Sequence, residues 1–272
     1  MNLALTPAQD CLARHRVRVF GDGRRTLVFG PGFGCQQLVW EPVAMELARE
    51  HRVVLFDFHT EHGLPHDPQA PPYDSLWAHG TDVVEMLAAL DLHDAIFVGH
   101  SVAAMIGLLA AIQAPGRLER LVMLGPSARY LNDPPHYTGG FEREQVDGLL
   151  DLMDRNFMDW SRTLAPLAFG EFNDPRHAAN FQARLCGQDP RALREFLQLT
   201  LLSDHRAELA RCPVPVLVVQ NPHDDFVPMA ATRFLVDKLP DARLRLLDAS
   251  GHCPHISHPH QVVRALRETL AA

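Results

Sequence analysis

The sequence predicts an α/β fold in which a mainly parallel central sheet is flanked by helices. Short runs of β-branched and apolar residues alternate along the chain with stretches of helical periodicity, which is typical of a parallel sheet with covering helices. Continuous apolar runs such as 121–124 and 216–219 indicate strands that are buried on both faces. One further apolar run ends in a serine, Ser101, and is followed directly by a helical pattern.

The expected elements follow one another in order. The strand-like runs cover residues 16–20, 26–29, 52–56, 95–98, 120–124, 214–220 and 243–247. The helical patterns between and after them cover residues 41–50, 75–91, 102–113, 229–239 and 259–271.

From residue 127 to residue 204 the strand pattern stops. Four helical patterns take its place, at 141–153, 157–167, 174–185 and 190–202. We therefore expect core residues 1–126, a helical insertion 127–204 and core residues 205–272. An insertion between two strands of such a sheet is expected over the carboxyl edge, where open α/β sheets bind ligands.

Composition excludes several classes of function. The 272 residues are 47% hydrophobic and carry a net charge of −8, without a basic cluster among aromatic residues, so nucleic acid is not an expected partner. Residues 1–16 lack the pattern of a signal peptide and no apolar run is long enough to span a membrane. Five scattered cysteines without a Cys-x-x-Cys pair favour a reducing compartment, and we expect a cytoplasmic protein.

The run 97–107, which contains Gly99, Ser101 and Ala103, resembles a nucleophile elbow of the form Gly-x-Ser-x-Gly. A serine at this sharp turn is exposed at the carboxyl edge of the sheet and beside the amino end of a helix, which favours developing negative charge. Ala103 replaces the second glycine, and alanine is the next smallest side chain.

A serine needs a base, and the base needs an orienting acid. Asp224 follows the apolar run that ends at residue 220, and His252 follows the run that ends near residue 247, so the order Ser101, Asp224, His252 is that of α/β-hydrolases. Asp225 competes with Asp224, but the spacing of Asp224 to Pro228 favours Asp224 as the acid.

Two further sequence features have alternative readings. Four histidines, 252, 255, 258 and 260, raise a metal site as an alternative, but two prolines interrupt them and no carboxylate joins them, so we expect no metal. The glycine-rich run 30–35 lacks the spacing of a dinucleotide fingerprint. We expect it to form an oxyanion hole from the backbone N–H groups of Phe33 and Val102.

The chain resembles the α/β-hydrolase branch that includes the bacterial stress regulator RsbQ and the plant karrikin and strigolactone receptors, most closely RsbQ. The segments that carry the resemblance are residues 32–40, 99–102, 131–135, 139–142, 203–206 and 251–255. The resemblance implies a lid of four helices, inserted after the sixth strand, over a narrow apolar pocket with the triad at its base and no cofactor. By position, the implied pocket residues are Phe33, His100, Tyr130, Phe141, Trp160, Leu164 and Leu201.

The chain departs from its relatives at several positions. Leu164 and Leu201 stand where plant relatives tend to carry phenylalanine, which indicates a differently shaped cavity. Gln36 replaces a commonly acidic residue and Ala103 a Ser or Gly. The run 58–66, with histidines 59, 62 and 66, replaces a Gly-rich loop. In relatives this loop lies beside the mouth of the site, so contact of these histidines with the substrate stays an alternative, but we expect a solvated loop.

These observations lead to two hypotheses. In the first, the protein is a serine hydrolase that cleaves a small apolar ester or lactone through an acyl-enzyme on Ser101. In the second, it is a ligand sensor or signalling adaptor that acts slowly on its ligand and contacts a protein partner through the lid. Peroxidase, carbon–carbon hydrolase and lyase chemistry use the same fold and stay open, whereas a dehalogenase would need Asp at position 101.

Overall fold

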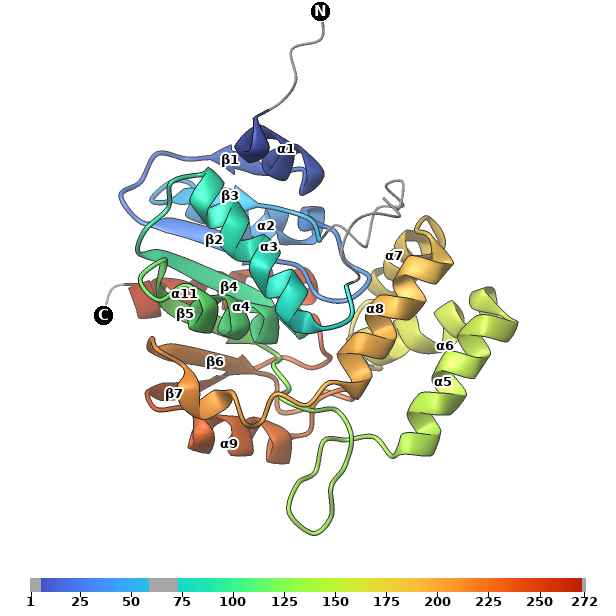
Figure 1. Ribbon diagram of the computed structural model, residues 1–272. Coiled ribbons are helices and arrows are strands. Elements are labelled where there is room, and N and C mark those ends of the chain that lie inside the picture. The colour runs from blue at the N-terminus through green and yellow to red at the C-terminus, as the bar shows by residue number, and fades with distance from the viewer. Residues whose placement is uncertain (1–5, 59–72, 271–272) are drawn as a thin grey trace, which may run out of the picture.

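A seven-stranded sheet forms the centre of the molecule in the computed structural model, which describes residues 6–58 and 73–270 (Figure 1). The spatial order is β1-β3-β2-β4-β5-β6-β7, with β1 antiparallel to β3 and every other pair parallel. The strands are β1 (Arg18–Phe20), β2 (Thr26–Gly30), β3 (Arg52–Leu55), β4 (Ala95–His100), β5 (Leu118–Leu124), β6 (Val216–Gln220) and β7 (Ala242–Leu246). The mainly parallel sheet expected from the sequence is confirmed.

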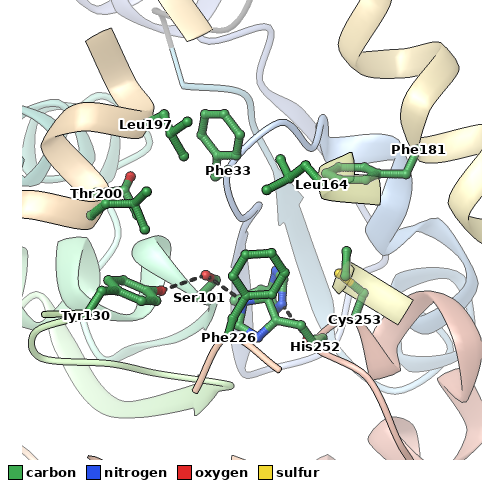
Figure 2. Close-up of a pocket in the computed structure, with 13 residues that line it drawn as sticks. Phe33, Ser101, Tyr130, Leu164, Phe181, Leu197, Thr200, Phe226, His252 and Cys253 are labelled. Carbon is green, nitrogen blue, oxygen red and sulfur yellow. Dashed lines mark hydrogen bonds between the residues drawn. The ribbon is translucent and has the colours of Figure 1, made fainter. Parts of the chain in front are cut away.

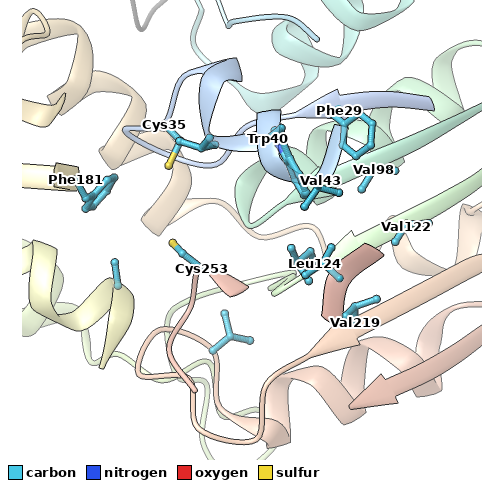
Figure 3. Packing of buried hydrophobic residues seen from close by; sticks show 14 of the residues in the cluster. Phe29, Cys35, Trp40, Val43, Val98, Val122, Leu124, Phe181, Val219 and Cys253 are labelled. Atoms are coloured by element: carbon cyan, nitrogen blue, oxygen red, sulfur yellow. The ribbon is translucent and has the colours of Figure 1, made fainter. Parts of the chain in front are cut away.

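The apolar runs are strands that are buried on both faces. In β2, Leu27 and Phe29 pack into one hydrophobic layer and Val28 packs into the layer on the opposite face, because successive side chains of a strand point to opposite sides. The same alternation continues through β3, β4, β5 and β6. Figure 3 shows part of the first layer, where Val98, Val122 and Val219 come from three neighbouring strands. The continuous apolar pattern therefore indicates a sheet with a hydrophobic layer on each face.

Helices cover the sheet from both sides. α2 (Glu41–Leu47) and α11 (Pro259–Leu270) bury their apolar faces in the first layer. α3 (Leu76–Ala89) and α4 (Val102–Gln113) bury theirs in the second, to which α9 (Met229–Lys238) also contributes. All five lie within two or three residues of the ranges expected from helical periodicity.

Short helices at the ends of strands were not expected from the sequence. α1 (Pro7–Arg14) is held by a capping box in which the Thr6 side chain accepts from the Gln9 backbone and the Gln9 side chain accepts from the Thr6 backbone. It is only eight residues long and Cys11 is its one buried residue, so its pattern is too short to stand out in the sequence. The other short helices are η1 (Gln37–Trp40), η3 (Leu209–Arg211) and α10 (Pro254–Ser257).

Four helices separate β5 from β6 along the chain and project from one end of the sheet (Figure 1). They are α5 (Arg143–Arg155), α6 (Phe157–Phe169), α7 (Pro175–Cys186) and α8 (Pro190–Leu202), called here the helical segment. The side chains of Asn156, Asp174 and Asp189 accept hydrogen bonds from the first backbone N–H groups of α6, α7 and α8, so each start is capped.

The helical segment follows β5, the fifth of the described strands, and not the sixth as the resemblance implied. In the described part of the chain one antiparallel strand, β1, precedes the parallel strands β2 to β5, so the segment begins after the fifth strand.

Ion pairs tie together the two chain segments that enter and leave the helical segment. Arg129 lies after β5 and Asp204 after α8; they form a backbone bridge, and the Arg129 Nη1 to Asp204 Oδ2 distance is 2.6 Å. Arg206 contacts Asp204 at 2.7 Å and Asp133 at 2.8 Å. The two connections to the core are therefore held side by side.

Two expectations from the sequence concern the run 58–66 and membrane-spanning helices. Histidines 59, 62 and 66 of the run 58–66 lie outside the described residues. Across residues 6–58 and 73–270, no helix is long and apolar enough to cross a membrane.

The Asp204 carboxylate is predicted to stabilise the fold above pH 4. Burial alone would raise its pKa, but hydrogen bonds from Arg206 and Arg129 lower the pKa from 3.8 to about 2. A lowered folded-state pKa means that this stabilisation is present above the unfolded-state pKa and is lost as the pH falls towards 2. We expect Asp204→Asn to lower the urea midpoint at pH 7 and to differ progressively less from the parent protein below pH 4.

The matched control is Asp147→Asn, which removes an exposed ion pair with Arg143 in the same segment. We expect it to change the urea midpoint little at any pH, because exposed pairs contribute little. A difference between Asp204→Asn and the parent that stays constant from pH 7 to pH 2.5 would contradict the assigned role of the carboxylate.

Candidate active site

Ser101 stands at a sharp turn between β4 and α4. Its backbone has φ 55° and ψ −124°, a conformation that side-chain-bearing residues rarely adopt. The turn is held because the Ser101 N–H donates to the Leu124 carbonyl on β5 at 2.8 Å, and the Ala104 N–H donates to the Ser101 carbonyl at 3.0 Å. The hydroxyl is thereby presented at the carboxyl edge of the sheet.

Two glycines allow the strand and the helix to approach each other at this turn. A Cβ at Gly99 would lie 2.6 Å from the Ala103 carbonyl oxygen, so only glycine fits there. A Cβ at Gly30 on β2 would lie 3.0 Å from the Ala103 Cβ. The alanine at position 103 is therefore accommodated because the strand opposite it carries a glycine.

Ser101, His252 and Asp224 form one hydrogen-bonded series, of which Figure 2 shows the contact between Ser101 and His252. The Ser101 Oγ to His252 Nε2 distance is 2.8 Å, and the His252 Nδ1 to Asp224 Oδ2 distance is also 2.8 Å. Asp224 lies in the loop after β6 and His252 in the loop after β7; the two loops are joined by the Gly251 N–H, which donates to the His223 carbonyl. The structure thus brings together the three residues that the sequence predicts as a triad.

The Asp224 carboxylate accepts four hydrogen bonds. Oδ1 accepts from the backbone N–H groups of Phe226 and Val227, and Oδ2 accepts from Gln220 Nε2 and His252 Nδ1. Burial alone would raise the pKa of this carboxyl, whose side chain is 2% exposed, but His252 and these donors hold the pKa below its ordinary value. Asp224 is therefore ionised at neutral pH, whereas the neighbouring Asp225 is exposed and does not contact His252.

The loop after β2 approaches the serine from the other side. It turns through a hydrogen bond from the Cys35 N–H to the Gly32 carbonyl, with Gly34 at φ +67°. Phe33 lines the same cavity as Ser101, and Val102 is the first residue of α4. The assignment of their backbone N–H groups as oxyanion donors stays a prediction.

Above Ser101 lies a mostly apolar pocket of about 470 Å³, its open mouth included. Its walls come from the sheet edge and from α6, α7 and α8 of the helical segment. The lining residues are Phe33, His100, Ser101, Tyr130, Leu164, Ala168, Phe181, Leu197, Thr200, Leu201, Phe226, His252 and Cys253.

Comparison with known proteins identifies the family. The model of the alpha/beta hydrolase family matches residues 27–265. This chain belongs to the α/β-hydrolase family. It is 33% identical to a karrikin insensitive 2 receptor of Petunia hybrida, with 93% of this chain and 94% of the receptor covered. It is 32% identical to the strigolactone esterase RMS3 of Pisum sativum, with 98% and 99% covered.

Among solved structures, the hydrolase olei00960 from Oleispira antarctica superposes with a TM-score of 0.94 at 29% identity, covering 99% of both chains. The predicted resemblance to the α/β-hydrolases and to the karrikin and strigolactone receptors is confirmed. The closer likeness to RsbQ stays a prediction.

The hydrolase pocket contains five of the seven residues expected in it, namely Phe33, His100, Tyr130, Leu164 and Leu201. Phe141 and Trp160 lie one layer behind. The Phe141 ring packs 6.2 Å from that of Phe226, and the Trp160 ring packs edge-on at 6.3 Å from that of Phe33. Each supports an aromatic residue that faces the cavity.

The other lining residues were not predicted, although some carried a signal. Ala168 is four residues after Leu164, and Leu197 is four before Leu201, so each shares a helix face with a predicted residue. Phe226 and Cys253 are close in sequence to triad members. Phe181 on α7 and Thr200 on α8 are the remaining two, and nothing in the sequence pattern singles them out.

The histidines near His252 do not converge on one point. His255 is fully buried, and its ring packs at a tilt, 4.4 Å from the ring of Trp40 and 4.3 Å from that of His100; burial holds its pKa well below its ordinary value. His260 lies on the surface, 3.5 Å from Glu46. In the described part of the hydrolase, no three His, Cys, Asp or Glu side chains are placed to hold a metal ion.

His100 is buried directly beneath His252. Burial, followed by the nearby His252, lowers the pKa of His100 to about 3, so the ring is neutral. Its Nε2 is 2.9 Å from the His252 carbonyl oxygen and must carry the proton, because a carbonyl can only accept. His100 therefore holds the backbone of His252.

The helical segment is hydrogen-bonded to both loops of the site. The His252 N–H donates to the Ala168 carbonyl in the last turn of α6 at 2.8 Å. Gln188, between α7 and α8, donates from Nε2 to the Gly34 carbonyl at 3.1 Å, one residue after Phe33. The wall of the pocket and its reactive groups are thus directly connected.

Proposed function

We propose that this hydrolase cleaves small apolar esters or lactones through an acyl-enzyme on Ser101. The observation that carries the proposal is the hydrogen-bonded series Ser101, His252 and Asp224 at the base of an apolar pocket. The name of its pea relative, a strigolactone esterase, supports an ester as the substrate class.

The first half of the reaction is acylation. Asp224 is ionised and accepts from His252 Nδ1–H, so the Nε2 atom is unprotonated and accepts from the Ser101 hydroxyl. Ser101 Oγ attacks the substrate carbonyl as its proton passes to Nε2, and the oxyanion is held by the N–H groups of Phe33 and Val102. His252 then returns this proton to the leaving oxygen, and the C–O bond to the alcohol breaks.

The second half is hydrolysis of the acyl-enzyme. A water molecule takes the place of the alcohol, gives a proton to His252 Nε2 and attacks the acyl carbon. The proton then returns to Ser101 Oγ as the acid leaves. In a lactone the alcohol and the acid belong to one product, so ring opening follows the same steps.

The pocket wall supports the substrate class. Leu164, Ala168, Leu197 and Leu201 from the helical segment face Ser101 without a charged group among them, which favours an apolar acyl or alcohol group. We propose that residues 127–204 act as a lid between core segments 1–126 and 205–272. All five cysteines are free thiols, which supports our proposal of a reducing, cytoplasmic setting.

Ser101→Ala is predicted to lower kcat on p-nitrophenyl butyrate by roughly 10⁴-fold or more, because the nucleophile is lost. A fluorophosphonate probe should label the parent protein and not this variant, as read by intact-protein mass spectrometry. Ser161→Ala is the control, since Ser161 is a buried serine that donates to the Met158 carbonyl on α6. Turnover retained by Ser101→Ala would overturn the proposed function.

The two neighbouring carboxylates offer a matched pair of variants. Asp224→Asn is expected to lower kcat by about 10⁴-fold, because an amide presents the wrong partner to His252 Nδ1 and reverses its tautomer. Asp225→Asn changes an exposed group and should leave kcat unaltered. Steady-state kinetics at pH 7.5 distinguishes them, and equal losses in both variants would contradict the assignment of Asp224.

A second candidate function is ligand sensing through a protein partner. It is favoured by the hydrogen bonds from His252 to Ala168 and from Gln188 to Gly34, which join the site to the helical segment. A ligand that displaces the His252 loop or the Phe33 loop must strain or break these contacts. Occupation of the pocket would then change the conformation of the helical segment, including its outer surface. The relative from petunia is named as a receptor.

If the helical segment reports occupancy, covalent modification of Ser101 should change its dynamics. We expect phenylmethylsulfonyl fluoride to alter hydrogen–deuterium exchange in α6 and at the α7–α8 junction around Gln188, because both contact the modified site. Ser101→Ala treated in the same way is the control. Complete modification of Ser101 without a change of exchange in these segments would contradict the sensing function.

A further inference from the structure

The hydroxyl of Tyr130 reaches the nucleophile. Tyr130 lies in the connection between β5 and α5, is 4% exposed, and places its hydroxyl 3.1 Å from Ser101 Oγ. Figure 2 shows Ser101 between Tyr130 on one side and His252 on the other. A hydroxyl at this distance from the proposed nucleophile can donate a hydrogen bond to the reacting atoms, which an apolar wall residue cannot do.

The direction of this hydrogen bond follows from counting protons. His252 Nδ1 faces the ionised Asp224 and carries the ring proton, so Nε2 accepts from Ser101. The Ser101 hydroxyl has one proton, and that proton is directed to His252. Ser101 Oγ can therefore only accept from Tyr130, which is the donor.

The Tyr130 O–H is kept as a donor by its surroundings. Burial raises the pKa of the phenol well above its ordinary value, so the group stays protonated throughout the working pH range. Thr200 also carries a hydroxyl in the pocket wall. That hydroxyl donates to the Phe196 carbonyl at 2.7 Å and is therefore directed away from Ser101.

The backbone that carries Tyr130 is fixed on both sides. The preceding carbonyl, that of Arg129, accepts from Ser127 Oγ at 2.8 Å and from the Tyr137 hydroxyl at 2.7 Å. The Tyr130 carbonyl accepts from the Phe141 N–H at 3.1 Å. A donor held in this way needs little reorganisation during a reaction, which is the property that makes oxyanion donors effective.

We propose that Tyr130 is a catalytic residue. Its hydroxyl is a third donor to the oxyanion, from a side chain, in addition to the two backbone N–H groups. When Ser101 attacks, Oγ becomes an ester-type oxygen and a weak acceptor. The oxyanion is bonded to the same carbon, so a donor that reaches Oγ also reaches it after a small rotation. An O–H group takes the most negative acceptor within reach, which is now the oxyanion. This inference rests on the proposed hydrolase mechanism.

The test is Tyr130→Phe, which removes the donor and keeps the ring. We expect kcat to fall by about 10-fold to 100-fold, somewhat less than for loss of a donor from a two-donor site, with KM nearly unchanged. The loss should be similar for p-nitrophenyl butyrate and ethyl butyrate, because both form the same oxyanion. A loss confined to the ethyl ester would place the hydroxyl at the leaving oxygen and overturn the proposal.

The matched control is Tyr73→Phe, which removes a tyrosine hydroxyl that donates to Asp82 at 2.8 Å and does not line the pocket. We expect kinetics like those of the parent protein. Equal losses of kcat in the two variants, or a change of KM alone in Tyr130→Phe, would assign Tyr130 a structural role and overturn the proposal.

A second measurement does not depend on turnover. Phenylboronic acid forms a tetrahedral adduct with an active-site serine, and its affinity, followed by tryptophan fluorescence, should fall in Tyr130→Phe by the factor seen in kcat. Ser101→Ala should not bind it. Unchanged affinity in Tyr130→Phe, beside an active parent protein, overturns this inference alone. If the parent protein shows neither turnover nor an adduct, the proposed function fails and the inference with it.

Discussion

The buried Asp224 carboxylate is the constraint on which the rest of the active site depends. A charge with 2% of its side chain exposed is tolerated because four N–H groups satisfy it, three of them from its own strand end and loop. Its charge then decides where every proton lies. His252 must carry hydrogen on Nδ1, so Nε2 accepts from Ser101, and Ser101 accepts from Tyr130. One fixed charge thus orients the three other side chains of the series.

The fold could be predicted where burial on both faces leaves a simple pattern. β2 to β6 and the long helices match the expected ranges closely, because strands between two layers are continuously apolar and the helices have one apolar face. α1 could not be predicted in this way. It is eight residues long, buries only Cys11 and depends on the local cap of Thr6 and Gln9, so its apolar pattern is too short to be distinguished from a loop.

That Ser101, Asp224 and His252 lie together was easier to predict than the residues of the pocket wall. Each of the three residues follows a strand. A parallel sheet places all such positions at one edge, independently of how the helices pack. The wall depends instead on how α6, α7 and α8 rotate against the core. Trp160 and Leu164 are one helical turn apart, yet Leu164 faces the cavity and Trp160 packs behind Phe33. No sequence pattern encodes that rotation.

The contacts of the helical segment limit how the wall can move independently of the chemistry. The Ala168 carbonyl holds the backbone of His252, and Gln188 holds the backbone next to Phe33. A rigid shift of α6 would move the base, and a shift of the α7–α8 junction would move the loop assigned to the oxyanion. Because these contacts join the wall to the loops of His252 and Phe33, we infer that a ligand that fits the wall poorly disturbs one of these two loops. In the proposed mechanism, selection of the substrate and its turnover therefore depend on the same few hydrogen bonds.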